Sequence, residues 1–203
     1  MLRAAERNTD SNVCNNDDCI PVNAPTDNLL VERVSCICQW GGGFVPMIGD
    51  KDTSWGADCS FIPGTSATTC APRGDIQNVV FRNSLFNHTT TAVIMKSTPV
   101  SEGTIRNVTY ENLRLHDVRT GVCINVATQG CAHDGDDVDK RMPAHLRTAR
   151  SNTVAGVMNV EGVIVRNISG DGVLLAGYLN CPQDLKGVLA QGNCTGLALE
   201  RVR

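Results

Sequence analysis

Two stretches of the chain, NVVFRN at residues 78–83 and NVTYEN at residues 107–112, share one frame: two asparagines enclose four residues of alternating character. In the second stretch, Val108 and Tyr110 lie on one side of an extended chain and polar residues lie on the other, because successive side chains of a strand alternate. The frame therefore predicts short strands that repeat along the chain. It returns with small changes as NLLVERV from residue 28, GVIVRN from residue 162 and GLALER from residue 196.

A second apolar strand follows each of the first four frames. These strands are FVPMIG at residues 44–49, TAVIMK at 91–96, GVCINV at 121–126 and GVLLAGYL at 172–179. Two strands per repeat without helical periodicity are typical of a parallel β-helix, in which each coil stacks on the previous one. A β-sandwich is the main alternative, but its strands should recur at regular intervals of about 8–12 residues. We therefore predict an all-β chain with a single parallel β-helix domain over residues 1–203.

The frames are unevenly spaced, so loops must be inserted between coils. We expect one insertion at about residues 51–74, which Cys59 and Cys70 would close, and a second, charged insertion at about residues 127–156. The second contains DGDDVDK, which is similar to a calcium-binding loop. However, the twelfth position counted from Asp134 is His145 rather than the glutamate that such a loop requires. We expect a solvated acidic loop and no metal site.

Charge and cysteine content limit the function. The net charge of −3 without lysine or arginine blocks gives no footprint for nucleic acid or a membrane surface. No apolar stretch approaches the roughly 18 residues that span a bilayer, and the first ten residues lack the apolar segment of a signal peptide. Ten cysteines without paired CxxC motifs favour disulfides in a secreted chain, as do the glycosylation triplets at Asn87, Asn107, Asn167 and Asn193. We expect that an N-terminal part, signal included, is absent from this sequence.

Several motifs appear in the order in which they occur in polygalacturonases. They are NTD at residues 8–10, NDDC at 16–19, VSCICQWGGG at 34–43, AVIMKS at 92–97 and RNVTYENL at 106–113. The chain thus resembles family 28 glycoside hydrolases, which are right-handed parallel β-helices of the pectin lyase-like type and hydrolyse pectin. The resemblance implies a secreted, monomeric enzyme that needs no cofactor and acts on polygalacturonate in the cell wall. It also implies that several N-terminal coils of the family domain are missing.

The resemblance assigns roles to five residues. Asp17 corresponds to the general acid, and Asp18 and Asp10 would share the role of the base in an inverting hydrolysis of α-1,4-galacturonosidic bonds. Such a centre needs an acid and a carboxylate about 6.5–9.5 Å apart, with a water molecule between them. Lys96 and Tyr110 correspond to substrate-binding residues. Asp10 precedes Asp17 by only seven residues, which is less than the circuit of about 20 residues that stacking on the next coil requires.

Other motif positions differ from the family pattern. Gly42 stands nearest the position of the family's histidine, and Ile94 stands at the position of its arginine. Lys96 remains, but an ammonium cannot bind a carboxylate with the paired bonds of a guanidinium. His88 belongs to a later coil, where we expect a surface turn. These differences favour the alternative function: a catalytically inactive β-helix, either a carbohydrate-binding or decoy protein or an incomplete gene product. A polysaccharide lyase is a weaker third possibility, because no cluster of calcium-binding carboxylates with an arginine base is visible.

The cysteine positions agree with the resemblance. In the family, the cysteine of the DDC motif commonly bonds to the next coil, which implies a disulfide from Cys19 to Cys36 or Cys38. Local loop closures would join Cys59 to Cys70 and Cys181 to Cys194. The partners of Cys14, Cys123 and Cys131 are left open.

Overall fold

The structure is a computed structural model of the chain, and it contains strands but no helix among the residues that it describes. These are residues 6–15, 17–37, 42–48, 57–61, 68–72, 74–97, 103–125, 157–180 and 191–202. The strands are β1 (Glu6–Thr9), β2 (Asn12–Val13), β3 (Ile20–Asn23), β4 (Thr26–Glu32), β5 (Ser35–Ile37), β6 (Gly42–Ile48), β7 (Ala57–Phe61), β8 (Thr68–Pro72), β9 (Ile76–Asn87), β10 (Thr91–Ser97), β11 (Gly103–His116), β12 (Thr120–Asn125), β13 (Val157–Asp171), β14 (Leu175–Asn180), β15 (Gln191–Thr195) and β16 (Ala198–Val202).

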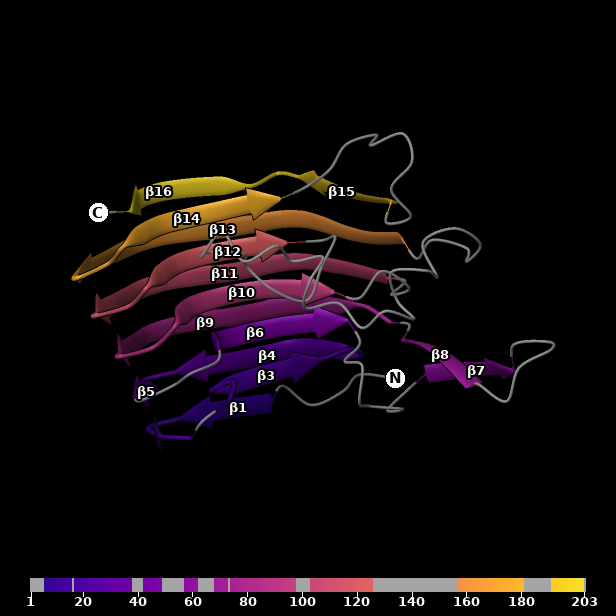
Figure 1. Ribbon diagram of the computed structural model, residues 1–203, viewed down its shortest axis with the longest axis horizontal. Helices are drawn as coiled ribbons and strands as arrows, with labels where there is room; N and C mark the ends of the chain where they lie inside the picture. Colours follow the sequence, from indigo (N-terminus) through magenta and orange to yellow (C-terminus); the bar gives the residue numbers. More distant parts are fainter. Residues whose placement is uncertain are drawn as a thin grey trace.

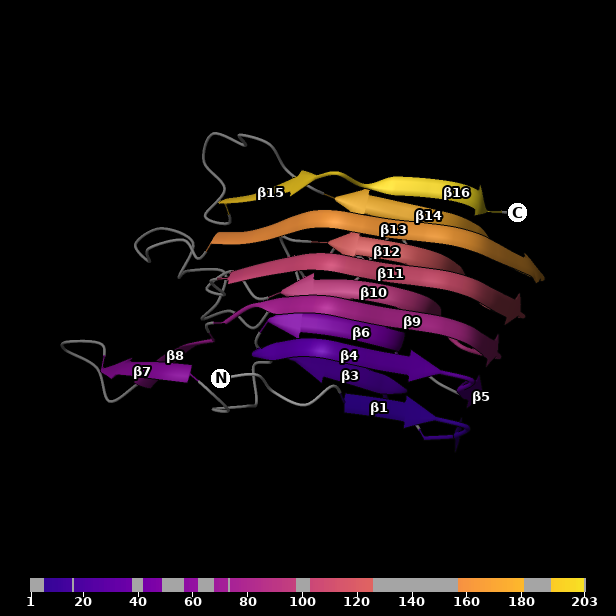
Figure 2. The ribbon, with the colours of Figure 1, turned by 180° about the vertical axis from the view of Figure 1, so that it is seen from behind.

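Within the described residues, these strands form two large parallel sheets (Figures 1 and 2). The nine-stranded sheet runs in the order β1, β4, β9, β11, β13, β15, with β2, β5 and β16 extending its rows. The five-stranded sheet runs in the order β3, β6, β10, β12, β14. The chain alternates between the sheets, so each circuit adds strands to both and forms one coil. The predicted parallel β-helix is therefore confirmed, and the β-sandwich is excluded.

Bends in the nine-stranded sheet fall on the two ends of the repeated frame. Both end positions have a positive φ, between 51° and 63° in all five frames. Asparagine and glycine tolerate this left-handed conformation better than other residues, which explains why the frame so often begins and ends with asparagine. The first positions are Asn28, Asn78, Asn107, Gly162 and Gly196, and the last are Arg33, Asn83, Asn112, Asn167 and Arg201.

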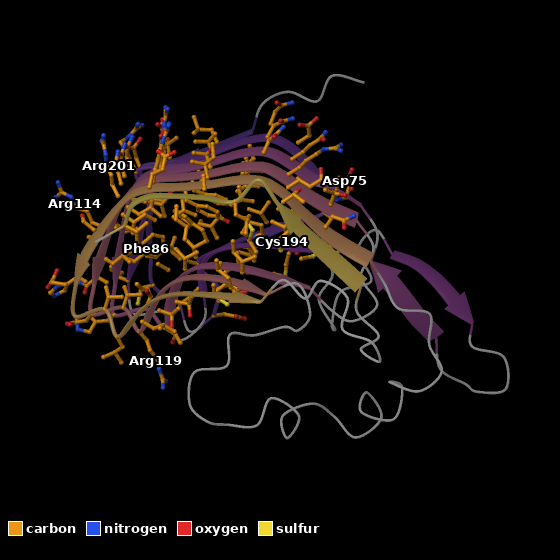
Figure 3. All side chains as sticks on the ribbon, turned by 90° about the horizontal axis from the view of Figure 1, so that it is seen from above. Asp75, Phe86, Arg114, Arg119, Cys194 and Arg201 are labelled. Atoms are coloured by element: carbon orange, nitrogen blue, oxygen red, sulfur yellow. A yellow bond between two sulfur atoms is a disulfide. The ribbon has the colours of Figure 1, made fainter. Side chains whose placement is uncertain are left out.

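The interior of the coils is filled by apolar side chains, as the view along the stack shows (Figure 3). Phe81 lies between two aromatic rings, stacked on Phe44 at 4.6 Å and on Tyr110 at 4.9 Å between ring centroids. Phe86 contacts Phe44 edge-on at 4.8 Å. Phe81 and Tyr110 are partners on neighbouring strands, which are about 4.8 Å apart, so their rings stack, whereas Phe44 meets Phe81 and Phe86 from the five-stranded sheet. The alternation of the frame thus builds a continuous core.

The outer side of the nine-stranded sheet carries rows of paired polar side chains. In one row, the register aligns Glu32, Arg82, Glu111, Arg166 and Glu200, so the charge alternates from coil to coil. Arg82 Nη2 lies 2.8 Å from Glu32 Oε2, and Arg166 Nη2 lies 2.6 Å from Glu111 Oε2. In a second row, the amide of Asn112 donates to Asn83 at 3.0 Å and accepts from Asn167 at 3.1 Å. Such cross-strand pairs fix the register between coils.

The insertion expected at residues 51–74 contains the antiparallel pair β7–β8, which projects to the side of both sheets (Figure 1). Its register places Cys59 directly opposite Cys70, as a loop-closing disulfide would require. The Cys59–Cys70 disulfide stays a prediction. The Cys181–Cys194 disulfide also stays a prediction, because Cys181 lies outside the described residues. The second expected insertion, at residues 127–156, lies outside them as well.

Between coils, Cys19 is bonded to Cys36, which decides between the two expected partners of Cys19. Cys14, Cys123 and Cys194 are also in disulfides.

Candidate functional site

The acid pair lies in a short polar turn that leads into β3 of the five-stranded sheet. Asn15 holds this turn with its side chain: Oδ1 accepts the N–H of Asp17 at 3.1 Å, and Nδ2 donates to the carbonyl oxygen of Asp18 at 3.4 Å. Asp17 Oδ1 accepts the N–H of Asp18 at 2.8 Å. Side chains of asparagine and aspartate commonly bond to nearby backbone groups in this way. The turn leaves Asp17 exposed and Asp18 partly buried.

The second coil fixes the acid pair from the other side. The N–H of Gly42 donates to Asp18 Oδ1 at 2.7 Å, and the carbonyl oxygen of Gly42 accepts the N–H of Cys19 at 2.8 Å. The Cys19–Cys36 disulfide adds a covalent connection directly after the two acids. Asp18 and the following Cys19 are thus attached to the second coil by two hydrogen bonds and one disulfide.

Lys96 lies in β10 of the five-stranded sheet, near the end of the strands that is opposite to the acid pair. The register aligns Gly42, beside Asp18, with Thr91 of β10, and Lys96 comes five residues later in that strand. Five residues of an extended strand cover roughly 16 Å. A chain of several sugars could span this distance, whereas a single sugar could not.

Asp10 lies between β1 and β2 of the nine-stranded sheet, next to Arg33 of the coil above it. Arg33 Nε lies 2.6 Å from Asp10 Oδ1, and Nη2 lies 2.9 Å from Oδ2, so the guanidinium binds both carboxylate oxygens. This pairing raises the pKa of the Arg33 guanidinium further above its ordinary value. The acid pair, in contrast, precedes a strand of the five-stranded sheet. The expectation that Asp10 shares the base role therefore finds no support in this geometry.

A comparison with known protein families finds one match, over residues 59–136, to the model of glycosyl hydrolases family 28. This stretch is similar to family 28. It includes β9 to β12 and carries Lys96 and Tyr110, whereas the acid pair precedes it. A search of the curated proteins found no match.

Tyr110 of the family 28 stretch is buried in the core of the coil. None of its surface is exposed, and burial raises the pKa of its hydroxyl well above the ordinary value. The hydroxyl has no hydrogen-bond partner among the residues that the structure describes. A substrate-binding role for Tyr110 is not compatible with this placement, so the expectation taken from the resemblance needs correction. The alternation within the frame, which puts Tyr110 on the same side as Val108, was the signal for an inward side chain.

Two positions at which the chain differs from the family 28 motifs lie beside the acid pair. Ile94 packs with Val45 and Met47 in a small buried apolar cluster, separate from the main core. Gly42 adjoins this cluster: a Cβ built on it would lie 2.7 Å from Ile94 Cδ1. Where the family motifs have a histidine and an arginine, this chain thus has an apolar contact.

His88 and the content of metal-binding groups and apolar helices were the other features expected from the sequence. His88 is a surface residue, with 65% of its side chain exposed and its Nε2 3.4 Å from Asp117 Oδ2. Over the described ranges, no group of three histidine, cysteine, aspartate or glutamate side chains could hold a metal ion. Nor does that part of the chain contain a helix long and apolar enough to cross a membrane.

Proposed function

We propose that the chain is a polygalacturonase-like glycosidase that hydrolyses the α-1,4-galacturonosidic bonds of pectin with inversion. The observation that carries this proposal is the acid turn, in which two adjacent carboxylates are held by Asn15 and by the backbone of Gly42. The family 28 match over the following coils supports a glycosidase.

In the proposed reaction, Asp17 donates a proton to the glycosidic oxygen as the bond to the anomeric carbon breaks. Asp18 accepts a proton from the water molecule whose oxygen attacks that carbon from the opposite face. The exposed position of Asp17 suits contact with the leaving group, and the fixed position of Asp18 suits orientation of the water. Asp10 and Tyr110 have no part in this mechanism.

Lys96 serves as a substrate-binding residue in this proposal. Since it lies roughly 16 Å along the sheet from the acid pair, its ammonium would bind the carboxylate of a different sugar unit from the one that reacts. This arrangement favours a polymer over a short sugar. The disulfide and the glycosylation triplets support action outside the cell. The resemblance to family 28 is the basis for proposing a monomer that acts on pectin.

A catalytically inactive, carbohydrate-binding β-helix is the second candidate, and a decoy protein or an incomplete gene product would show the same absence of catalysis. The contact between Gly42 and Ile94 favours this candidate, because neither of these two positions supplies an imidazole or a guanidinium. The acid turn would then be only a polar connection between strands.

The deciding experiment measures release of reducing ends from polygalacturonate by the purified protein. We expect release by the parent chain and none by Asp17→Asn. Asp171→Asn is the matched control, since Asp171 is an exposed carboxylate on another coil, and it should behave as the parent. Calorimetric titration with oligogalacturonate separates the candidates. Binding without release would support the inactive β-helix, and absence of both would contradict both proposals.

A further inference from the structure

Gly42, the first residue of β6, contacts the acid turn through both of its backbone polar groups. Its N–H donates to Asp18 Oδ1 at 2.7 Å, and its carbonyl oxygen accepts the N–H of Cys19 at 2.8 Å. One residue of the second coil therefore holds two consecutive residues of the first coil. A backbone group of the neighbouring coil thus orients the Asp18 carboxylate.

The space around Gly42 excludes any side chain. A Cβ built there would lie 2.6 Å from Val45 Cγ2, 2.7 Å from Ile94 Cδ1 and 3.2 Å from Asp18 Oδ1. Carbon atoms in favourable contact are about 3.5–4.0 Å apart. Ile94 can turn its terminal carbon away, whereas the Val45 methyl is fixed on a buried, β-branched residue. A side chain at position 42 would therefore push the backbone of β6, and with it the N–H, away from Asp18.

We infer that Gly42 is a positioning residue for the acid pair, and that Val45 and Ile94 leave no room for a side chain at this position. This inference rests on the proposed function and adds the group that directs the base. It also connects the two departures from the family motifs, since positions 42 and 94 are in contact. A fixed direction of the Asp18 carboxylate acts on the chemical step more than on substrate binding. Its loss should lower kcat and leave KM nearly unchanged.

The test compares four proteins: the parent, Gly42→Ala, Val45→Ala and the double variant. Val45→Ala is the matched control, because it disturbs the same apolar cluster without adding an atom beside Asp18. We expect Val45→Ala to lower the melting temperature and keep the parental kcat. Gly42→Ala should lose at least about tenfold in kcat, with KM within about twofold of the parent. The double variant should recover kcat, because the removed methyl groups make room for the new Cβ.

Parental kcat in Gly42→Ala, or a double variant no better than Gly42→Ala, would overturn the inference. A second measurement covers the case in which Gly42→Ala does not fold. Asp18→Asn keeps an acceptor oxygen for the N–H of Gly42, and Asp18→Ala removes it, so Asp18→Ala should melt about 4 °C lower than Asp18→Asn. Equal melting temperatures would refute the contact. A parent chain that releases no reducing ends would instead refute the proposed function, and the Asp18 pair would still test the contact.

Discussion

Glu32 is a charged side chain with only 2% of its surface exposed. Its carboxylate is bound by two guanidiniums: Arg82 Nη2 lies 2.8 Å from Oε2, and Arg33 Nη1 lies 2.9 Å from Oε1. A carboxylate removed from water needs such partners. The side chains of Arg33 and Arg82 are 46% and 39% exposed, so water can solvate both cations if the carboxylate is lost. The cost of losing Glu32 is therefore moderate.

Replacing Glu32 with Gln should lower the free energy of unfolding by about 1–3 kcal/mol, because the neutral amide loses both ion pairs and offers one acceptor oxygen to two guanidiniums. Urea denaturation measures this change. Glu111→Gln is the control, since the Glu111 side chain is 16% exposed and is paired with Arg166. A loss in Glu32→Gln no larger than in Glu111→Gln would show that the buried position adds nothing.

The buried hydroxyl of Tyr110 is a second group whose contribution can be tested. Its hydroxyl is buried without a hydrogen-bond partner among the described residues, and removing such a group can be neutral or stabilising. We expect Tyr110→Phe to keep the parental KM and to change the free energy of unfolding by less than about 1 kcal/mol. Kinetics on polygalacturonate and urea denaturation check both values. A rise in KM with unchanged stability would restore Tyr110 as a substrate contact.

At the scale of the strand, the asparagines that end the frames have two functions. Asn112 adopts a left-handed conformation with φ of 54°, and its amide also bonds to Asn83 below and Asn167 above. The same residue type thus bends the strand and ties three consecutive coils together. Asn107 and Asn167 lie in these rows although they also begin glycosylation triplets.

Two substitutions of Asn112 separate the bend from the amide bonds. Asn112→Gly should lose only the amide bonds, because glycine adopts a positive φ without strain. Asn112→Ala should lose about 1 kcal/mol more in the free energy of unfolding, because alanine is strained in this conformation. Chemical denaturation of both variants measures the difference. Equal losses would mean that the bend is set by neighbouring coils and not by residue 112.

The strands could be predicted from the sequence, because the alternation of apolar and polar residues and the turn-forming residues are visible as residue types. The frame around Tyr110 predicted its strand and the side that Tyr110 shares with Val108, but not the bends at the two asparagines. The hydrogen bond that holds Asp18 was not predictable from the sequence. Its donor is the backbone N–H of Gly42, and every residue except proline has such a group. The partner of Asp10 was also missed: spacing excluded the stacking expected for the base, but it did not indicate Arg33.

At the scale of the whole molecule, stability is distributed over neighbouring coils. Each coil of a stacked repeat contacts mainly the coils directly above and below it. The Cys19–Cys36 disulfide joins the first coil to the second. A defect at this end should therefore remain local and leave the distant coils intact.

Replacing both Cys19 and Cys36 with Ser should lower the free energy of unfolding by about 3 kcal/mol, from the closure of a short loop. Hydrogen exchange should show faster exchange in β3 and unchanged exchange in β11 and β13, because these two strands do not pair with a strand of the first coil. Faster exchange throughout would instead indicate that all coils unfold as one unit.

The alternating row of Glu32, Arg82, Glu111, Arg166 and Glu200 has a consequence for how such a chain changes length during evolution. Deleting the coil that carries Arg82 would bring Glu32 beside Glu111, and duplicating it would bring two arginines together; like charges on adjacent strands repel. Gain or loss of two coils keeps the alternation. The row thus favours insertion or deletion of an even number of coils.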